Sequence, residues 1–346
     1  MRKDAYHDQA VVIHRARDLR LDDRRVDPLK PGEVRLQMAW GGICGSDLHF
    51  YRDGGVGASI VRNPMVLGHE LSGIVCEVAT DVEGFVPNDP VAIHPARLCG
   101  ECQECSAGRN NLCRNVRFLG SAALNPHCDG GFRRYMSIHH AQLRHLPPGL
   151  DLETAALTEP MAVVLHAINR AGPVDGRSVL VQGAGPIGIL LVAALKLRGA
   201  GRIVATDLNS LPLEIVASVG ATEAWNTSSN FPEEEFDVVF EATGVAAALA
   251  SAIVRTRRGG VLVQVGIFAP GPVSAPLSLI INREIDFRGS WRFDAEFDEA
   301  LDVLAKHKQY VSRLITHRFD LPDYLEAFQT ASNRTIASKV LLKLNG

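Results

Sequence analysis

The sequence predicts a two-domain α/β protein in which an irregular β domain precedes a parallel sheet covered by helices on both faces. Three observations support this prediction. The length of 346 residues suggests about two domains of ordinary size. Up to about residue 150 the chain consists of short apolar or alternating runs separated by Gly, Pro and Asp, which is typical of strands. From about residue 176 apolar strands alternate with helical segments, the pattern of a parallel sheet.

The first region contains three clear strand candidates. These are "EVRLQMAW" at 33–40, "LSGIVCEV" at 71–78 and "DPVAIHP" at 89–95. The proline-rich segment "LPPGLDLETAALTEP" at 146–160 then indicates a seam between the domains.

The second region begins with the strand "SVLVQG" at 178–183 and the apolar helix 186–200, which has Pro near its start and Gly at its end. Further strands are expected at 202–207, 236–244, 259–266 and 284–290, with helices at 211–220 and 245–256. Two amphipathic helices, 297–307 and 321–331, and a closing strand, 338–344, complete the chain.

Charge and hydropathy exclude several classes of partner. The net charge of −3 and the 22% of charged residues give no indication of nucleic acid or an anionic membrane surface. No apolar run approaches the roughly 20 residues of a membrane-spanning helix, and the start "MRKDAYHDQA" lacks the apolar core of a signal peptide. We therefore expect a cytoplasmic protein without nucleic-acid or membrane partners.

A glycine motif between a strand and a helix predicts a dinucleotide site. Gly183, Gly185 and Gly188 form G-x-G-x-x-G, which permits a tight turn and close approach of the backbone to a pyrophosphate at the helix N-terminus. Asp207 ends the next strand, where a carboxylate would accept hydrogen bonds from the adenosine ribose and repel a 2′-phosphate. The motif favours NAD over NADP; the alternative is a glycine turn that binds nothing.

Four of the seven cysteines lie within one short loop. "CGECQECSAGRNNLC" has the spacing C-x2-C-x2-C-x7-C and comprises Cys99, Cys102, Cys105 and Cys113. Four thiolates complete a tetrahedral zinc site with no open position, which is a structural site. An iron–sulfur cluster is the competing interpretation, but a ferredoxin-type run has a shorter last gap followed by Pro, whereas Arg114 follows here. Plain thiols are the third alternative.

A second set of metal-ligand types is dispersed along the chain. Cys44 lies in "GGICGSDLHFY", His69 and Glu70 lie in "VLGHELSG", and Glu159 lies in "LTEPMAVVLHA". Cys44 alone could be a nucleophile, a ligand or a core residue, and a lone His or Glu is usually an ordinary side chain. Together they supply the three ligand types of a catalytic zinc, which keeps one position open.

These motifs, in this order and together with "GAGPIG", resemble the zinc-dependent medium-chain dehydrogenases over nearly the whole chain, and Glu159 resembles their polyol branch, which includes sorbitol dehydrogenase. The resemblance implies a GroES-like catalytic domain at 1–158, a Rossmann dinucleotide-binding domain at 159–295, and a C-terminal segment at 296–346 that returns to the catalytic domain. It also implies a homo-oligomer, either a tetramer or a dimer.

The resemblance further implies roles for individual residues. Cys44, His69 and either Glu159 or Glu70 would hold the catalytic zinc, and Ser46 and His49 would relay a proton, unless Ser46 only caps the helix near Asp47 and His49 is a surface residue. The substrate contacts would be Phe50, Phe118, Ser121 and Arg292, and the cofactor contacts Gly183, Gly185, Pro186, Ile187, Gly188, Asp207, Val265, Gly266 and Ile267.

The expected activity is an NAD-dependent oxidation of a secondary alcohol of a sugar acid or polyol, with one catalytic and one structural zinc. Zinc lowers the pKa of the substrate hydroxyl, and the nicotinamide accepts the hydride. Arg292 could meet a carboxylate with two hydrogen bonds, which suits a sugar acid better than a neutral polyol. The alternatives are sorbitol or xylitol, threonine or butanediol oxidation and, from another class, a non-catalytic nucleotide-binding scaffold.

Overall fold

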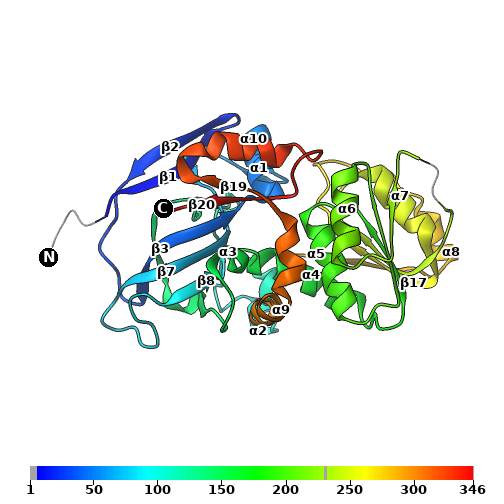
Figure 1. Ribbon diagram of the computed structural model, residues 1–346, viewed down its shortest axis with the longest axis horizontal. Coiled ribbons are helices and arrows are strands. Elements are labelled where there is room, and N and C mark those ends of the chain that lie inside the picture. Colours follow the sequence, from blue (N-terminus) through cyan, green and yellow to red (C-terminus); the bar gives the residue numbers. More distant parts are fainter. Residues whose placement is uncertain (1–5, 230–231, 346) are drawn as a thin grey trace.

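The computed structural model describes residues 6–229 and 232–345 and divides into two lobes (Figure 1). One lobe holds the N-terminal strands together with the last two strands of the chain, and the other holds the parallel sheet and its helices. Within the described residues, no helix is long and apolar enough to cross a membrane.

The larger sheet of the first lobe has seven strands in the order β12-β8-β7-β3-β20-β19, with β11 also pairing with β3. Its antiparallel pairing of β3 with β7 sets Gly42 opposite Glu70, and β20 pairs with the other edge of β3. The C-terminal segment therefore completes the N-terminal sheet. The strands are β3 (Glu33–Gly42), β7 (Glu70–Val78), β8 (Pro90–Ile93), β11 (Tyr135–His139), β12 (Leu143–His145), β19 (Ile315–Asp320) and β20 (Lys339–Lys343).

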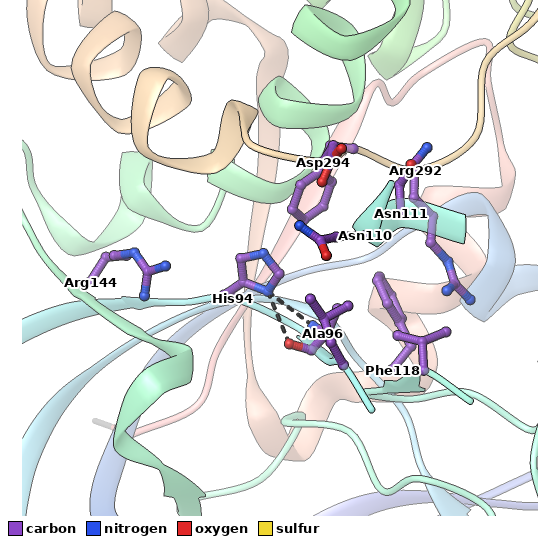
Figure 2. A pocket seen from close by; sticks show the side chains of 11 residues that line it. His94, Ala96, Asn110, Asn111, Phe118, Arg144, Arg292 and Asp294 are labelled. Carbon is purple, nitrogen blue, oxygen red and sulfur yellow. Dashed lines mark hydrogen bonds between the residues drawn. The ribbon is translucent and has the colours of Figure 1, made fainter. Parts of the chain in front are cut away.

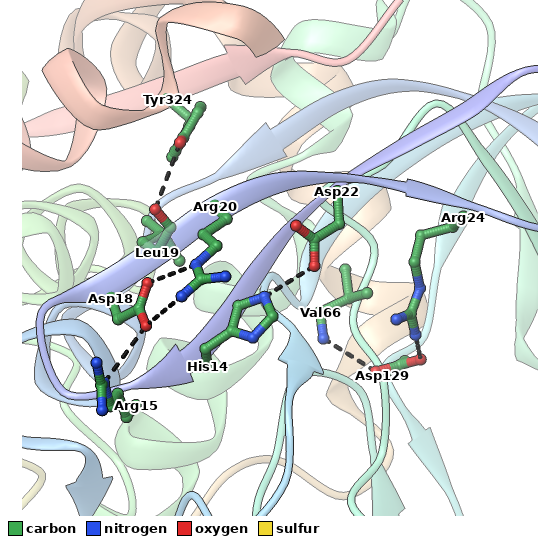
Figure 3. Close-up of polar contacts among 10 residues, drawn as sticks. All are labelled: His14, Arg15, Asp18, Leu19, Arg20, Asp22, Arg24, Val66, Asp129 and Tyr324. Carbon is green, nitrogen blue, oxygen red and sulfur yellow. Dashed lines mark hydrogen bonds and ion pairs between the residues drawn. The ribbon is translucent and has the colours of Figure 1, made fainter.

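A three-stranded sheet of β1 (Asp8–Arg15), β2 (Asp18–Arg24) and β6 (Met65–Val66) covers this lobe. Figure 3 shows the polar contacts of its hairpin, where Nε2 of His14 lies 2.8 Å from Oδ2 of Asp22 and Arg24 pairs with Asp129 at 3.0 Å. The Tyr324 hydroxyl, on helix α10 (Tyr324–Ser332), donates to the Leu19 carbonyl at 3.3 Å. The N-terminal hairpin and helix α10 are thus joined by a hydrogen bond.

The second lobe contains a six-stranded parallel sheet in the order β15-β14-β13-β16-β17-β18. Successive residues of its strands point to opposite faces: Val179 and Val181 pack with helices α4, α5, α6 and α9, whereas Leu180 packs with α7. Both faces are buried, which confirms the predicted doubly wound sheet. Its strands are β13 (Ser178–Gln182), β14 (Arg202–Asp207), β15 (Glu223–Asn226), β16 (Phe236–Glu241), β17 (Thr256–Gln264) and β18 (Asp286–Gly289).

The helices are α1 (Gly45–Asp53), α2 (Gln103–Ser106), α3 (Leu152–Ala155), α4 (Thr158–Ala171), α5 (Pro186–Leu197), α6 (Ser210–Val219), α7 (Ala246–Arg255), α8 (Leu277–Asn282), α9 (Glu296–Val311) and α10. Short strands form β4 (Gly55–Val56) with β5 (Ser59–Ile60), and β9 (Ala96–Arg97) with β10 (Arg117–Phe118). The 3₁₀ turns are Asn110–Leu112, His140–Gln142, Ser312–Leu314 and Leu321–Asp323.

The segment predicted as a domain seam contains helices that the sequence analysis did not predict. The segment 146–160 contains α3 and the start of α4, and α4 continues into the second lobe, where it packs against α5 and α9. Pro160 is the third residue of α4, where the N–H that proline lacks has no helical partner in any case. The proline that indicates a break in the sequence is therefore part of a helix start.

Candidate active site

Two neighbouring strand ends assemble the first group of metal-ligand side chains. Cys44 lies immediately before α1, two residues after β3 ends, and His69 immediately precedes Glu70, the first residue of β7. Because Gly42 and Glu70 are paired in the sheet, the three side chains meet. One ligand atom each from Cys44, His69 and Glu70 lies within 4.8 Å of the others.

The surroundings of this group fit a cation. His69 is 6% exposed and Glu70 is 1% exposed, and among the described residues Nδ1 of His69 has no hydrogen-bond partner. Burial lowers the pKa of His69, but the charges of Asp47, Cys44 and Glu159 outweigh burial and raise this pKa to about 10. An imidazole that attracts a proton this strongly sits in a negative field, and the same field together with the sulfur, nitrogen and carboxylate donors suits Zn²⁺.

Asp47 is a residue that sequence reasoning assigned no role. It is fully buried, and its carboxylate accepts hydrogen bonds from the backbone N–H of Cys44 at 2.9 Å and of Gly68 at 3.2 Å. Its Oδ1 also lies 3.9 Å from Nδ1 of His69. Asp47 therefore fixes the backbone next to two ligands at once; the signal in the sequence is an Asp three residues after a Cys at a helix start.

Lys339 is a second missed residue and comes from the opposite end of the chain. Its side chain is 2% exposed, and Nζ forms an ion pair with Oε2 of Glu70 at 2.5 Å, although the contact lacks the directionality of a hydrogen bond. Nζ also donates to the Ile43 carbonyl at 3.1 Å. Gly42 leaves room for this pair, because a Cβ at that position would collide with the Glu70 carboxylate.

Glu159 is the second residue of α4 and is 6% exposed. Burial raises the pKa of its carboxyl to about 7, with His69 acting in the opposite sense and Glu70 adding to the increase. It is thus close to the group but is not one of the three residues whose ligand atoms lie within 4.8 Å of each other.

The predicted relay residues lie on α1. Cys44 is the N-cap residue of this helix, so Ser46 has no capping role, and its side chain is half-buried. His49 is exposed, and its Nδ1 lies 3.0 Å from Oδ2 of Asp53. Phe50 belongs to the hydrophobic core of the first lobe, which gives it a packing role.

A cavity of about 190 Å³ lies beside this group (Figure 2) and is lined by Phe118, Arg292, His94, Asn111, Asp294 and Arg144, among others. The Phe118 ring centroid is 5.6 Å from that of His69, and the guanidinium of Arg292 lies 4.5 Å from the Phe118 centroid. Ser121 lies farther along the same loop, where its backbone bridges to Cys128 and its Oγ accepts from the N–H of Ala123. Of the predicted substrate contacts, the structure brings Phe118 and Arg292 together.

The four-cysteine loop is also assembled as the spacing predicts. One sulfur each from Cys99, Cys102, Cys105 and Cys113 lies within 4.8 Å of the others. Hydrogen bonds from the backbone N–H groups of Glu101 and Cys102 lower the pKa of Cys99, whereas burial and the neighbouring sulfurs raise that of Cys105. Sulfurs this close together repel one another as thiolates, so the arrangement fits a cation such as Zn²⁺.

The glycine motif has the geometry of a phosphate site. Gly183 has φ +92°, Gly185 is the N-cap of α5, and a Cβ on Gly188 would collide with the Gly183 carbonyl. Pro186 and Ile187 open the helix. The Asp207 carboxylate accepts hydrogen bonds from the backbone N–H groups of Ala184 and Asn209, each at 2.9 Å. The acid predicted to bind the ribose therefore also holds the glycine turn in place.

A buried glutamate contacts the turn that is predicted to line the nicotinamide. Val265, Gly266 and Ile267 follow β17, and a Cβ on Gly266 would collide with the backbone of Gly244. Glu241 is fully buried and accepts hydrogen bonds from the N–H groups of Thr243 at 2.7 Å and Gly244 at 3.0 Å, and from the Gln264 amide. Glu241 thus joins the two turns, and the sequence offered only its place at a strand end as a signal.

Comparison with known proteins identifies both lobes. Residues 30–148 match the alcohol dehydrogenase GroES-like domain, and residues 186–306 match the zinc-binding dehydrogenase family. The chain is 38% identical to sorbitol dehydrogenase of Gallus gallus, with 96% of each chain covered, and 36% identical to L-idonate 5-dehydrogenase (NAD(P)(+)) of Escherichia coli, with 96% and 98% covered. The crystal structure of the Escherichia coli L-idonate 5-dehydrogenase is similar with a TM-score of 0.92, 35% identity and 98% of each chain covered.

Proposed function

The chain belongs to the zinc-containing medium-chain dehydrogenases of the sorbitol and L-idonate dehydrogenase type, and from this membership we propose that it oxidises a secondary hydroxyl of a sugar acid, L-idonate first, with NAD as the acceptor. The family makes it an NAD(P)-dependent zinc dehydrogenase that acts on the CH–OH groups of a polyol or sugar acid. The identity of the substrate and the preference for NAD are the parts that we propose.

In this proposal the catalytic zinc is held by Cys44, His69 and one of the carboxylates Glu70 and Glu159. Bound zinc supplies Lewis acidity, which lowers the pKa of a substrate hydroxyl and stabilises the alkoxide. One thiolate and one carboxylate give the ligand set two negative charges. Asp47 orients the backbone of Cys44 and of the residue before His69, and Lys339 neutralises Glu70 when this carboxylate is not a ligand.

The hydroxyl proton leaves through Ser46 and His49. In this relay the hydroxyl of Ser46 would accept the substrate proton while releasing its own, and the exposed imidazole of His49, beside Asp53, would take up the released proton and pass it to solvent. Val265, Gly266 and Ile267 would line the nicotinamide of a bound cofactor, which would supply the hydride acceptor. The Gly183–Gly188 turn and the free N–H groups of α5 would hold the phosphates.

Arg292 carries the preference for an acid substrate. Within the part of the chain that the structure describes, its guanidinium forms no ion pair with a carboxylate, yet it lies over Phe118, next to His69. Burial lowers the pKa of Arg292, while Glu159 and Cys113 act in the opposite sense. A guanidinium without a carboxylate beside the metal group suits a substrate carboxylate, which it can bind with two hydrogen bonds.

The test is NADH formation with L-idonate, D-gluconate, sorbitol, xylitol, L-threonine and 2,3-butanediol. We expect the highest kcat/KM with L-idonate and a weaker response with NADP. Arg292→Gln should lower kcat/KM for the acid by roughly tenfold to a hundredfold and leave the value for sorbitol within about twofold. Sorbitol is the second candidate because of the Gallus gallus relative, and a higher kcat/KM with sorbitol than with L-idonate in the wild type would support it. An unchanged acid preference in Arg292→Gln would show that Arg292 does not carry this preference.

We also propose that residues 1–158 and 296–346 form the catalytic domain and 159–295 the nucleotide-binding domain. The pairing of β20 with β3 supports this division; its outermost residues, 1–5 and 346, lie outside the described residues. A cytoplasmic dimer or tetramer stays a prediction.

A further inference from the structure

We propose that Asn111, which lies two residues before Cys113 in the four-cysteine loop, is a positioning residue of the substrate site and holds the backbone of Arg292 through the Trp291 carbonyl. This role rests on the proposed function, because Arg292 is the residue to which we assign the preference for an acid substrate. It gives the turn beside the cysteines a part in substrate selection.

The backbone at Arg292 adopts a conformation that residues other than glycine rarely take. Its φ angle is +54°, which lies in the left-handed region, where the Cβ of an L-residue is crowded. Arg292 belongs to the connection 290–295 between β18 and α9, which contains no helix or strand. Such a conformation persists only where surrounding contacts determine it. The contacts of this connection therefore decide where the Arg292 guanidinium points.

Two side chains from other segments hold the connection on either side of Arg292. Nδ2 of Asn111 donates to the Trp291 carbonyl at 3.0 Å. Oε2 of Glu296, the first residue of α9, accepts from the Asp294 N–H at 2.7 Å. The Trp291 carbonyl belongs to the peptide bond that joins Trp291 to Arg292, so the Asn111 contact fixes one of the planes that define φ of Arg292.

His166, on α4, connects these two anchors. Its Nε2 lies 3.3 Å from Nδ2 of Asn111, and its Nδ1 lies 3.0 Å from Oε1 of Glu296. With its hydrogen on Nδ1, the ring donates to the carboxylate and accepts the second hydrogen of the Asn111 amide. Burial raises the pKa of Glu296, but the hydrogen bonds from His166, the Asp294 N–H and Asn169 outweigh burial and lower this pKa to about 2. The contacts thus run without a break from the cysteine loop through α4 to a charged carboxylate on α9.

The fixed backbone places the guanidinium of Arg292 where a substrate can meet it. It lies 5.1 Å from the Trp291 ring centroid and 4.5 Å from that of Phe118, and Arg292 and Asn111 line the same cavity (Figure 2). A carboxylate bound by two hydrogen bonds needs a guanidinium plane in a fixed position, whereas a neutral polyol does not use this contact. Loss of the Asn111 donor should therefore weaken an acid substrate and spare a polyol.

The experiment combines hydrogen–deuterium exchange with steady-state kinetics on the zinc-loaded protein. Asn111→Ala and Asn111→Leu remove the donor with and without a loss of side-chain volume. Asn115→Ala is the matched control, because Asn115 is an exposed amide two residues beyond Cys113. We expect exchange in the segment 290–295 to rise in both Asn111 variants and to stay unchanged in Asn115→Ala. With L-idonate, KM should rise by roughly threefold to thirtyfold while kcat stays within about twofold, and neither value should change with sorbitol.

A double variant tests whether Asn111 acts through Arg292. Adding Asn111→Ala to Arg292→Gln should lower kcat/KM for L-idonate no further, because the group that Asn111 positions is already absent. If the two losses multiplied instead, Asn111 would contact the substrate itself, and the positioning role would be wrong.

The remaining outcomes separate this role from the proposed function. Unchanged exchange at 290–295 in the Asn111 variants would overturn the role whatever the substrate is, and raised exchange at 99–109 as well would assign the effect to damage of the cysteine loop. Equal losses with L-idonate and sorbitol would show that Asn111 does not select for an acid. If Arg292→Gln left the acid preference unchanged, the proposed function of Arg292 would fail and the selection by Asn111 with it, and exchange would still decide whether Asn111 holds the backbone.

Discussion

The buried ion pair between Lys339 and Glu70 gives the most specific prediction. Replacing Lys339 with Met keeps an unbranched apolar chain of similar length but removes the charge and the hydrogen bond to the Ile43 carbonyl. The Glu70 carboxylate then remains buried without its partner. We expect the variant to unfold more easily when no metal is bound and to bind zinc more tightly.

The size of the effect follows from the burial of the pair. At 2.5 Å, two unit charges in a medium of effective dielectric constant about 20 attract by about 7 kcal/mol, and desolvation offsets a large part of this attraction. Removing one partner of a pair this deeply buried costs about 3–5 kcal/mol, a third or more of the stability of many domains. Zinc supplies positive charge next to Glu70, so the loss should be smaller in the zinc-loaded protein. By the thermodynamic cycle, zinc should then bind the variant at least about tenfold more tightly.

The assay is urea unfolding at neutral pH of wild type, Lys339→Met, Glu70→Gln and the double variant, each with a chelator and with excess zinc. Competition with a chromophoric chelator would measure zinc affinity. The double variant should recover most of the lost free energy of unfolding, because neither charge remains. Lys343→Met, at the exposed end of the same strand, is the control. A loss below about 1 kcal/mol for metal-free Lys339→Met, or no recovery in the double variant, would refute this reasoning.

Three further predictions concern other parts of the site. Burial, with Arg144 adding to the effect, lowers the pKa of His94 to about 4 from its ordinary value of about 6.5, so its contribution to the free energy of unfolding is lost as the pH falls from 6.5 to 4. Unfolding curves across this range should therefore show a loss of up to roughly 3 kcal/mol that is absent in His94→Gln. Cys99→Ser should reduce the zinc content from two ions per chain to one, measured by plasma emission spectroscopy, and should make the 99–113 loop sensitive to protease. Two ions per chain in this variant would contradict a four-cysteine zinc site. Asp47→Ala leaves the N–H groups of Cys44 and Gly68 without their acceptor. It should lower the affinity of the catalytic site for zinc by roughly tenfold to a hundredfold in a chelator competition. An unchanged affinity would show that Asp47 does not position the ligands.

The predicted and missed elements show how much secondary structure can be read from local sequence patterns. Central strands of the parallel sheet such as β13 and β14 were predictable because each is a continuous apolar run, as at 178–183 and 202–207. The edge strand β15, "EAWN", is short and half polar, and it was not predicted. Helix α4 was not predicted either, because it is apolar on most of its surface and contains a proline near its start. Strand β19 escaped prediction for a related reason: "ITHRFD" is mostly polar, and it forms a strand by pairing with the apolar β20.

The sequence by itself determined the sites whose members are close together in the chain. The glycine turn 183–188 and the cysteine loop 99–113 each place their functional groups within one short segment, so spacing alone specifies the geometry. The tertiary structure decided what depends on register between distant strands. Lys339 meets Glu70 only because β20 pairs with β3 at Leu341 and Gly42, and a shift of one residue would turn the Lys339 side chain to the other face. The sequences of β3 and β20 alone do not predict this pairing, because the free energy that selects it comes from the packing of the whole sheet.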